Sequence, residues 1–341
     1  MKKFIFLSLM LFFSCGAVGV KDSLNHIIEI PQKIERIAVV GGMWPLPSII
    51  VLLDSSSSRL VQIPKASKTA IKASVLADFY PEILNIHDGN TENIEEILNF
   101  KPDIALCHQA NKKLCSTLNS LGIPTLTLSV NIQNYNYKLT LKNWLEILGQ
   151  VLGKQALAEK LINANEKIEK QLQNQLKNIA NKPKAMILHR YSENEIVANG
   201  LFANYLLEHS GAENVFADFK TPKKVSLEEI YRRDPDIIYI TNFTPAMPED
   251  LFNSKLWADL RAIKNKRVYK IPLGTYRWFA PSAEFPVFLI WLAKHNHPEL
   301  FVTWDISKDL FRHFKEFYNK ELTLAQIHQI LFPSPEAGKL Q

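Results

Sequence analysis

Two segments of this 341-residue chain, which begin 133 positions apart, carry nearly the same sequence. NIEEILNFKPDIAL runs from Asn93 to Leu106, and SLEEIYRRDPDIIYI runs from Ser226 to Ile240. Each segment predicts a short acidic helix, a Pro-Asp corner and then an apolar strand. The spacing exceeds the roughly 20 to 50 residues of a solenoid repeat. The duplication therefore indicates two similar globular lobes, with a ligand site between them.

The first residues have the features of an export signal. A positive Met-Lys-Lys start precedes the apolar stretch Phe4–Phe13, and small residues follow. This apolar core is too short to span a bilayer, which needs about 20 residues. We assign residues 1–19 to the signal and expect a periplasmic protein. Two processing sites are open: a lipoprotein signal that ends before Cys15, which would anchor a lipidated Cys15 to a membrane, or ordinary cleavage near Ala17-Val18-Gly19.

Apolar runs rich in Ile and Val alternate with helical patterns after the leader, which is typical of α/β lobes with largely parallel strands. We assign residues 20–150 to the N-terminal α/β lobe and residues 181–332 to the C-terminal α/β lobe, each Rossmann-like with a central, mostly parallel sheet. The predicted strands are Arg36–Val40, Leu60–Ile63, Asp103–Cys107, Thr125–Leu128, Lys184–His189, Asp236–Ile240 and Arg267–Ile271. We expect residues 333–341 to be a disordered tail, because they hold two prolines and little apolar content.

The segment between the lobes, residues 151–180, contains the most regular helical pattern in the chain. Apolar residues recur at three- and four-residue steps over about Lys154–Asn178, without an internal Gly or Pro. The pattern predicts a single long α-helix that joins the lobes as a stiff connection.

Composition limits the kind of partner. Hydrophobic residues make up 47% and charged residues 22% of the chain, and the basic residues behind a net charge of +6 are dispersed. This excludes a concentrated nucleic-acid patch, and nothing in the sequence indicates more than a monomer. Cys107 and Cys115 are the two cysteines beyond the leader. An oxidising compartment permits a bond between them, but two cysteines do not make a disulfide scaffold, so we expect free, mostly buried thiols.

Enzyme motifs are missing from the sequence. It contains no G-x-S-x-G, H-E-x-x-H or P-loop pattern, and Gly41-Gly42 lacks the spacing of a dinucleotide fingerprint. We therefore expect a protein that is not an enzyme. The alternative is an exported hydrolase assembled from distant residues, for example Ser282 with His189.

Several motifs together resemble one protein family. They are P-x-x-I-x-R-I-A-V-V from Pro31, N-x-E-x-I-x-x-x-K-P-D from Asn93, L-G-I-P from Leu121, S-x-E-x-I-x-x-x-D-P-D from Ser226 and A-P-S-A-E-x-P from Ala280. With the long middle helix and the export signal, they resemble the helical-backbone class of bacterial periplasmic substrate-binding proteins. In that family such lobes serve ABC importers of ferric siderophores, cobalamin or haem. The segment Gly41–Pro47 departs from the family pattern, which leaves the ligand rather than the fold open.

Ligand-binding candidates follow from the predicted sheets. Ligands of open α/β sheets bind beyond the carboxyl ends of the strands, and we expect the residues that follow the strands to line the site. Arginine suits the oxygens of a carboxylate or catecholate, and aromatic rings supply flat walls. Such a lining predicts a bulky anionic chelate. The candidates are Trp44, His108, His189, Arg190, Tyr191, Phe243, Tyr276, Arg277 and Trp278.

Histidines provide a second kind of candidate. His108 and His189 each end a predicted strand, one in each lobe, and together they could complete the coordination of a metal chelate. The alternative is that each is structural. His295 and His297 lie in a polar turn before Pro298 and are expected to face water.

The repeated glutamates Glu95 and Glu228 have a role implied by the resemblance. In the resembled family, an acidic residue on each lobe pairs with arginines of the inner-membrane ABC permease. The alternative is stabilisation of the helix start, since a glutamate in the first turn favours the helix dipole.

We therefore predict the substrate-binding component of an ABC importer, which captures a metal chelate between its lobes and delivers it to the permease. The chelate is most simply a ferric siderophore, with iron as the carried metal and no covalent cofactor. Cobalamin, haem or a nickel complex are the rival ligands.

Overall fold

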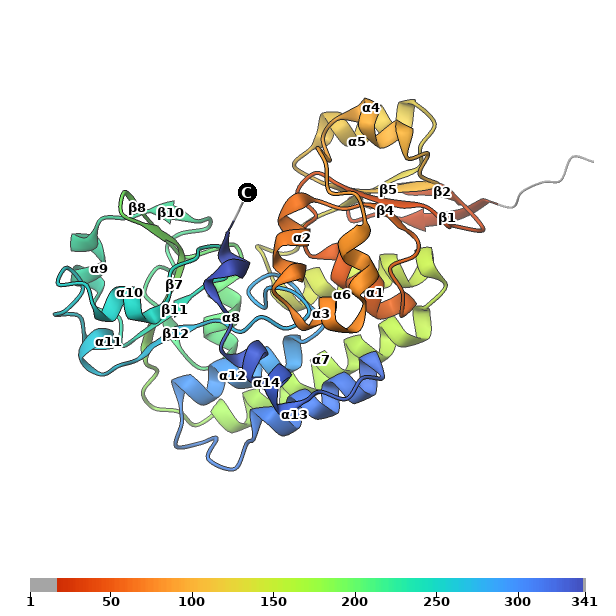
Figure 1. The fold of residues 1–341 in the computed structure, drawn as a ribbon. Coiled ribbons are helices and arrows are strands. Elements are labelled where there is room, and N and C mark those ends of the chain that lie inside the picture. Colours follow the sequence, from red (N-terminus) through yellow and green to blue (C-terminus); the bar gives the residue numbers. More distant parts are fainter. Residues whose placement is uncertain (1–16, 340–341) are drawn as a thin grey trace, which may run out of the picture.

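A computed structural model describes residues 17–339 of the chain. It has two α/β lobes above a long helix, α7, and the C-terminal helices lie beside that helix (Figure 1). The predicted fold class is confirmed. Among the described residues, no helix is long and apolar enough to cross a membrane.

The N-terminal lobe is built on a four-stranded parallel sheet in the order β4-β3-β5-β6. All four predicted strands of this lobe are present, because each is an apolar run that helices cover. The strands are β3 (Ile37–Val40), β4 (Leu60–Gln62), β5 (Ile104–His108) and β6 (Thr125–Leu128). The helices are α1 (Leu46–Asp54), α2 (Lys65–Lys72), α3 (Val75–Phe79), η1 (Pro81–Asn85), α4 (Ile94–Asn99), α5 (Lys112–Ser120) and α6 (Tyr137–Leu152).

An antiparallel hairpin precedes this sheet. Strand β1 (Ala17–Lys21) pairs along its whole length with β2 (Ile27–Pro31). The buried carboxylate of Asp22 accepts hydrogen bonds from the main-chain N–H groups of Leu24 and His26 in the turn. The last residues of the predicted signal, 17–19, thus belong to a strand, whereas Cys15 lies outside the described residues.

The C-terminal lobe has a mixed sheet in the order β10-β8-β7-β11-β12, with β9 beside β7. Strands β7, β9, β11 and β12 are parallel, whereas β8 pairs antiparallel with β7 and β10 pairs antiparallel with β8. The strands are β7 (Lys184–Ser192), β8 (Glu195–Ala198), β9 (Glu213–Asn214), β10 (Lys223–Lys224), β11 (Ile237–Ile240) and β12 (Val268–Lys270). The helices are α8 (Ala203–His209), α9 (Leu227–Arg233), α10 (Pro248–Phe252), α11 (Arg261–Lys264), α12 (Phe285–Asn296), α13 (Ile306–His313), η2 (Phe314–Tyr318) and α14 (Leu324–Leu331).

Helix α7 (Gln155–Leu176) is the predicted connection between the lobes. Its buried face includes a charged residue, Glu169, which is 3% exposed. The Glu169 carboxylate accepts hydrogen bonds from Lys138 of α6 and Tyr205 of α8, and His209 Nε2 lies 3.4 Å from it. Because α6 and α8 belong to different lobes, this one carboxylate ties both lobes to the connecting helix.

The expectation of free thiols is wrong. Cys107 and Cys115 form a disulfide, and their Cα atoms are 5.8 Å apart. The chain turns back after β5, so that the start of α5 packs against the end of the strand. This return brings the two residues within the distance that a disulfide requires.

The expectation that His295 and His297 face water is also wrong. His297 is 4% exposed, and its Nε2 lies 2.8 Å from the main-chain oxygen of Gly211. Burial lowers the pKa of His295 to about 4. Helix α12 is buried on nearly all sides, so the turn that ends it is buried as well.

The C-terminal residues are not a free tail. We expected residues 333–341 to be disordered, but residues 333–339 are placed and include a short 3-10 helix, η3 (Pro335–Gly338). Ala337 and Gly338 are buried. Residues 340–341 lie outside the described part of the chain.

Candidate ligand-binding site

Aromatic side chains from both lobes meet where the loops after the strands face each other. Trp44 follows β3 in the N-terminal lobe, and its ring centre lies 6.1 Å from that of Phe243, which follows β11. The ring of His189, within β7, lies 5.3 Å from Phe243, and Phe279 lies 5.7 Å from His189. We call these four residues the cleft cluster. It brings together three predicted ligand residues from separate strand ends.

Sequence reasoning missed Phe279, although it stands directly after the predicted Trp278. Its ring approaches His189 because residue 200 is a glycine: a Cβ at Gly200 would lie 2.3 Å from the Phe279 ring. The structure instead turns Trp278 into the interior, where it is fully buried and packs against Phe288 at 5.6 Å. Trp278 therefore supports the loop rather than the cleft cluster.

His189 is held neutral in this cluster. Burial, and then the nearby charge of Arg190, lowers the pKa of His189 to about 4. Its Nδ1 is buried and has no hydrogen-bond partner within residues 17–339. A buried polar atom without a partner is uncommon in native structures. The imidazole is thus available to a ligand that enters between the lobes.

His108 ends β5, where burial lowers its pKa. Its Nδ1 accepts a hydrogen bond from the main-chain N–H of Ala110 at 3.2 Å. Among the described residues, no group of three or more His, Cys, Asp or Glu side chains could hold a metal ion.

Arg277 is the cation at the centre of the site and is fully buried. Its guanidinium donates to the main-chain oxygen of Ala337 from Nε at 3.1 Å and from Nη2 at 2.6 Å. Its Nη1 donates to the Tyr276 hydroxyl at 2.8 Å and to the main-chain oxygen of Ala66, in the other lobe, at 3.2 Å. The guanidinium also lies 4.9 Å from the Phe243 ring centre.

Arg277 lacks an acidic partner. Within the described chain it forms no ion pair, and all four of its hydrogen bonds end on neutral oxygens. Burying a charge is costly unless an opposite charge compensates it. Arg277 therefore places a positive charge in the interior without an acidic partner among residues 17–339.

A second buried basic residue, Lys270, lies beside the loop that carries Phe243. Its ammonium donates to the main-chain oxygens of Thr241, Thr244 and Ala246 at 3.0, 2.7 and 2.8 Å. Burial, and then the charge of Arg277, lowers the pKa of Lys270 to about 7. Lys270 thus holds the loop that carries Phe243, and it is only partly protonated near neutral pH. The sequence does not predict this role of Lys270, because its partners are main-chain oxygens, which every residue carries.

Arg190 and Tyr191 lie at the rim. They border a cavity of about 360 Å³ together with Phe243 and the C-terminal Gly338 and Lys339. The Tyr191 hydroxyl accepts a hydrogen bond from the Trp257 indole at 3.2 Å. Arg190 is exposed, so it can approach a ligand only from the outside of the cleft.

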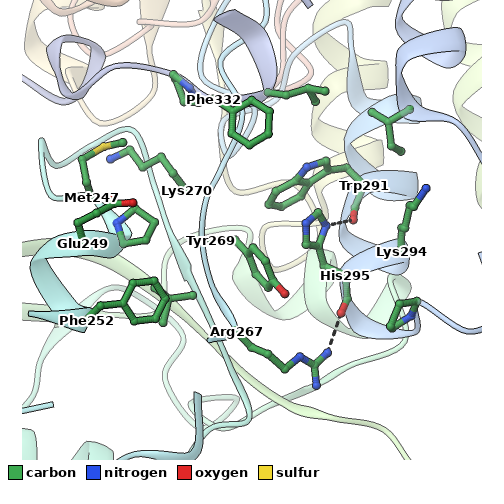
Figure 2. Close-up of a pocket in the computed structure, with 16 residues that line it drawn as sticks. Met247, Glu249, Phe252, Arg267, Tyr269, Lys270, Trp291, Lys294, His295 and Phe332 are labelled. Atoms are coloured by element: carbon green, nitrogen blue, oxygen red, sulfur yellow. Dashed lines mark hydrogen bonds between the residues drawn. The ribbon is translucent and has the colours of Figure 1, made fainter. Parts of the chain in front are cut away.

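A larger cavity, of about 680 Å³, lies within the C-terminal lobe beside β12 (Figure 2). Figure 2 shows Tyr269 between Arg267 and His295, with Phe332 and Trp291 nearby. Arg267 donates to the main-chain oxygen of His295 at 2.7 Å, and the Lys270 donors are likewise committed to carbonyls. This cavity is lined by residues of the C-terminal part of the chain and includes none of the predicted ligand residues.

Glu95 and Glu228 occupy equivalent places in the first turns of α4 and α9, and both are exposed. Neither forms an ion pair within residues 17–339, whereas the next residue in each helix does: Glu96 pairs with His87, and Glu229 pairs with arginines. The side chains of Asn93 and Ser226 already cap the two helices. Side-chain capping is thus supplied by other residues, while Glu95 and Glu228 lie in the first turns, where a carboxylate favours the helix dipole.

The sequence profile of the periplasmic binding protein family matches residues 56–273. The molybdate-binding protein MolA of Haemophilus influenzae is 26% identical over 320 residues, which cover 88% of this chain and 90% of that protein. The iron-uptake system-binding protein of Bacillus subtilis is 27% identical over 266 residues, which cover 73% of this chain and 78% of that protein. A crystal structure of a periplasmic solute binding protein from Veillonella parvula shares 29% identity, with a TM-score of 0.81 over 93% of this chain and 97% of that one. The chain belongs to the periplasmic binding protein family, as its motifs indicated.

The neutral state of His189 makes stability sensitive to acid. Its folded pKa of about 4 lies below the ordinary 6.5, so between these values the unfolded chain binds a proton that the folded chain does not. Stability rises with pH across this window. Acidification from about pH 7 to about pH 5 should cost about 2 kcal/mol through His189. Urea unfolding at both pH values should show a loss smaller by this amount in His189→Phe. The exposed His328→Phe serves as the control, and equal losses in all three proteins would contradict the buried neutral imidazole.

Proposed function

We propose that this chain is the substrate-binding component of an ABC importer and carries an anionic metal species. The observation behind the proposal is the buried Arg277, which donates to neutral oxygens alone within residues 17–339. The Phe243 ring of the cleft cluster lies 4.9 Å from its guanidinium, and the side chain of a second basic residue, Lys270, is buried nearby. An anion between the lobes would supply the missing negative charge, while the rings would cover its apolar surface.

The ferric siderophore predicted from the sequence is one such anion. A compact metal oxyanion is the second candidate, because the relative that covers 88% of this chain is described as molybdate-binding. Two cavities lie beside residues 333–339. They measure about 360 Å³ at the rim and about 640 Å³ beside α2. In either case His108 and His189 would contact the outer atoms of the metal species.

The charge of Arg277 provides the test of this function. Arg277→Gln keeps a hydrogen-bond donor for Ala337 but removes the charge, and should weaken binding of an anion at least tenfold, or about 1.4 kcal/mol. Tryptophan fluorescence titrations would use ferric siderophores, ferric citrate, molybdate, haem, nickel complexes and vitamin B12. Vitamin B12, which has little negative charge, should be affected far less.

The exposed Arg312→Gln, on α13, serves as the matched control. Thermal unfolding of each variant would show that it is folded before binding is compared. Equal losses for anionic and neutral ligands would remove the charge argument. If no ligand bound the wild-type protein more tightly than roughly 10 μM, the transport function would be rejected.

We further propose that Glu95 and Glu228 dock the loaded protein on the permease. Figure 1 places α4 at the top of one lobe and α9 on the outer side of the other. Each helix thus presents an unpaired, exposed carboxylate to the surroundings. Two such charges on separate lobes would steer the protein toward basic groups of the permease and fix its orientation.

The double variant Glu95→Ala with Glu228→Ala should reduce uptake by cells at least tenfold, while ligand affinity stays unchanged. Glu159→Ala with Glu208→Ala, two exposed carboxylates on α7 and α8, changes the net charge equally and should transport normally. Normal uptake by the first double variant would end the docking proposal.

The β1–β2 hairpin bears on processing of the leader. Cleavage near Ala17-Val18-Gly19 would remove most of β1 and unpair β2, whereas cleavage before Cys15 retains the whole hairpin. We propose that the signal ends before Cys15 and that this cysteine is lipidated. Mass spectrometry of the mature N-terminal peptide should find a lipid on Cys15, and Cys15→Ser should release the protein from membranes. A mature chain that starts at residue 18 or later would disprove this.

A further inference from the structure

The C-terminal segment, residues 333–339, crosses the space between the two lobes. In Figure 1 it is the dark-blue end of the chain, between α2 of the N-terminal lobe and β7 of the other lobe. Its helix η3 packs against α2, and its last described residues border the rim cavity with Tyr191 and Phe243. The segment therefore separates the rim cavity from the cavity beside α2, which it also borders.

The fit of this segment is tight at one glycine. A Cβ placed on Gly338 would lie 2.0 Å from the main-chain oxygen of Thr244 and 2.5 Å from the nitrogen of Pro245. No side chain fits there without movement of the backbone. The exposed Ser334, Pro335 and Glu336 precede this contact, so the buried part of the segment is confined to Pro333 and to Ala337 and Gly338.

The same segment engages the buried cation of the site. The main-chain oxygen of Ala337 accepts both the Nε and the Nη2 hydrogen bonds of Arg277. Paired donors of this kind are suited to the oxygens of a carboxylate, phosphate or similar oxyanion. A peptide oxygen satisfies the geometry of these donors but leaves the charge of Arg277 uncompensated.

We propose that residues 333–339 form a C-terminal latch that competes with the ligand for Arg277. The Ala337 oxygen occupies the position of a ligand oxygen, and an anion that binds Arg277 displaces the latch. This inference rests on the proposed function, because it assumes that an anion binds between the lobes. Only molecules in which the latch is released can bind the anion at Arg277. The apparent dissociation constant therefore equals the intrinsic one divided by the fraction of such molecules. With the latch seated in nine molecules of ten, its loss would tighten binding about tenfold.

Two variants release the latch in different ways. Gly338→Ala forces the segment away from Thr244 but leaves Arg277 and the rest of the chain intact. A chain that ends at Phe332 removes the segment altogether. Ser334→Ala, at an exposed position without a side-chain hydrogen bond among the described residues, is the matched control.

Calorimetric titration with sodium molybdate and with ferric citrate would compare these proteins with the full chain. We expect Gly338→Ala and the shortened chain to bind at least one of these probes about three- to tenfold more tightly, and Ser334→Ala to match the full chain. Hydrogen exchange of the C-terminal peptide gives a second readout. Exchange should be slow in the free full chain, faster in Gly338→Ala, and accelerated in the full chain by the probe that binds.

The outcomes separate the two claims. Equal or weaker binding by both variants would reject the latch and leave the proposed function standing. Slower exchange of the C-terminal peptide on ligand binding would also reject the latch, because the segment would then close over the ligand. If none of the four proteins bound either probe, a panel of other anions would decide the proposed function, and equally fast exchange of the C-terminal peptide in the free full chain and in Gly338→Ala would reject the latch.

Discussion

The arrangement of the lobes depends on the hydrogen bonds that the buried carboxylate of Glu169 accepts from Lys138 and Tyr205. This carboxylate sits on the connecting helix and receives donors from helices of both lobes. A buried charge of this kind requires its partners, since removal of any of them leaves an unsatisfied group in the interior. The two sheets are therefore held at a defined separation before any ligand arrives, and the loops at their carboxyl ends are brought face to face.

Because the two lobes lie close together, the positive charge of Arg277 is buried where they meet. Arg277 bridges to the N-terminal lobe through the oxygen of Ala66, and its charge helps to depress the pKa of Lys270. Arg277 is thus held fully buried, with main-chain oxygens and the Tyr276 hydroxyl as its hydrogen-bond partners. An anion that bound to Arg277, as we propose, would meet donors that are already oriented and desolvated.

The sequence predicted the elements that depend on periodicity and missed those that depend on main-chain contacts. The seven predicted strands and the connecting helix are present because apolar spacing determines them directly. The hairpin at Ala17–Lys21 was obscured by the leader that runs into it. The roles of Lys270 and Ala337 depend on carbonyl oxygens placed by tertiary folding, which residue types do not encode. The proline content of the C-terminal segment was interpreted as disorder, although proline also suits a short, packed turn.

The disulfide between Cys107 and Cys115 has a consequence for any laboratory that produces this protein. The bond encloses His108 in a short loop at the end of β5, and it persists only in an oxidising compartment. Protein accumulated in a reducing bacterial cytoplasm would carry two thiols at this place. The loop that contains His108 would then be less constrained than in the exported protein. Preparations from the two compartments would therefore differ in the structure of this loop.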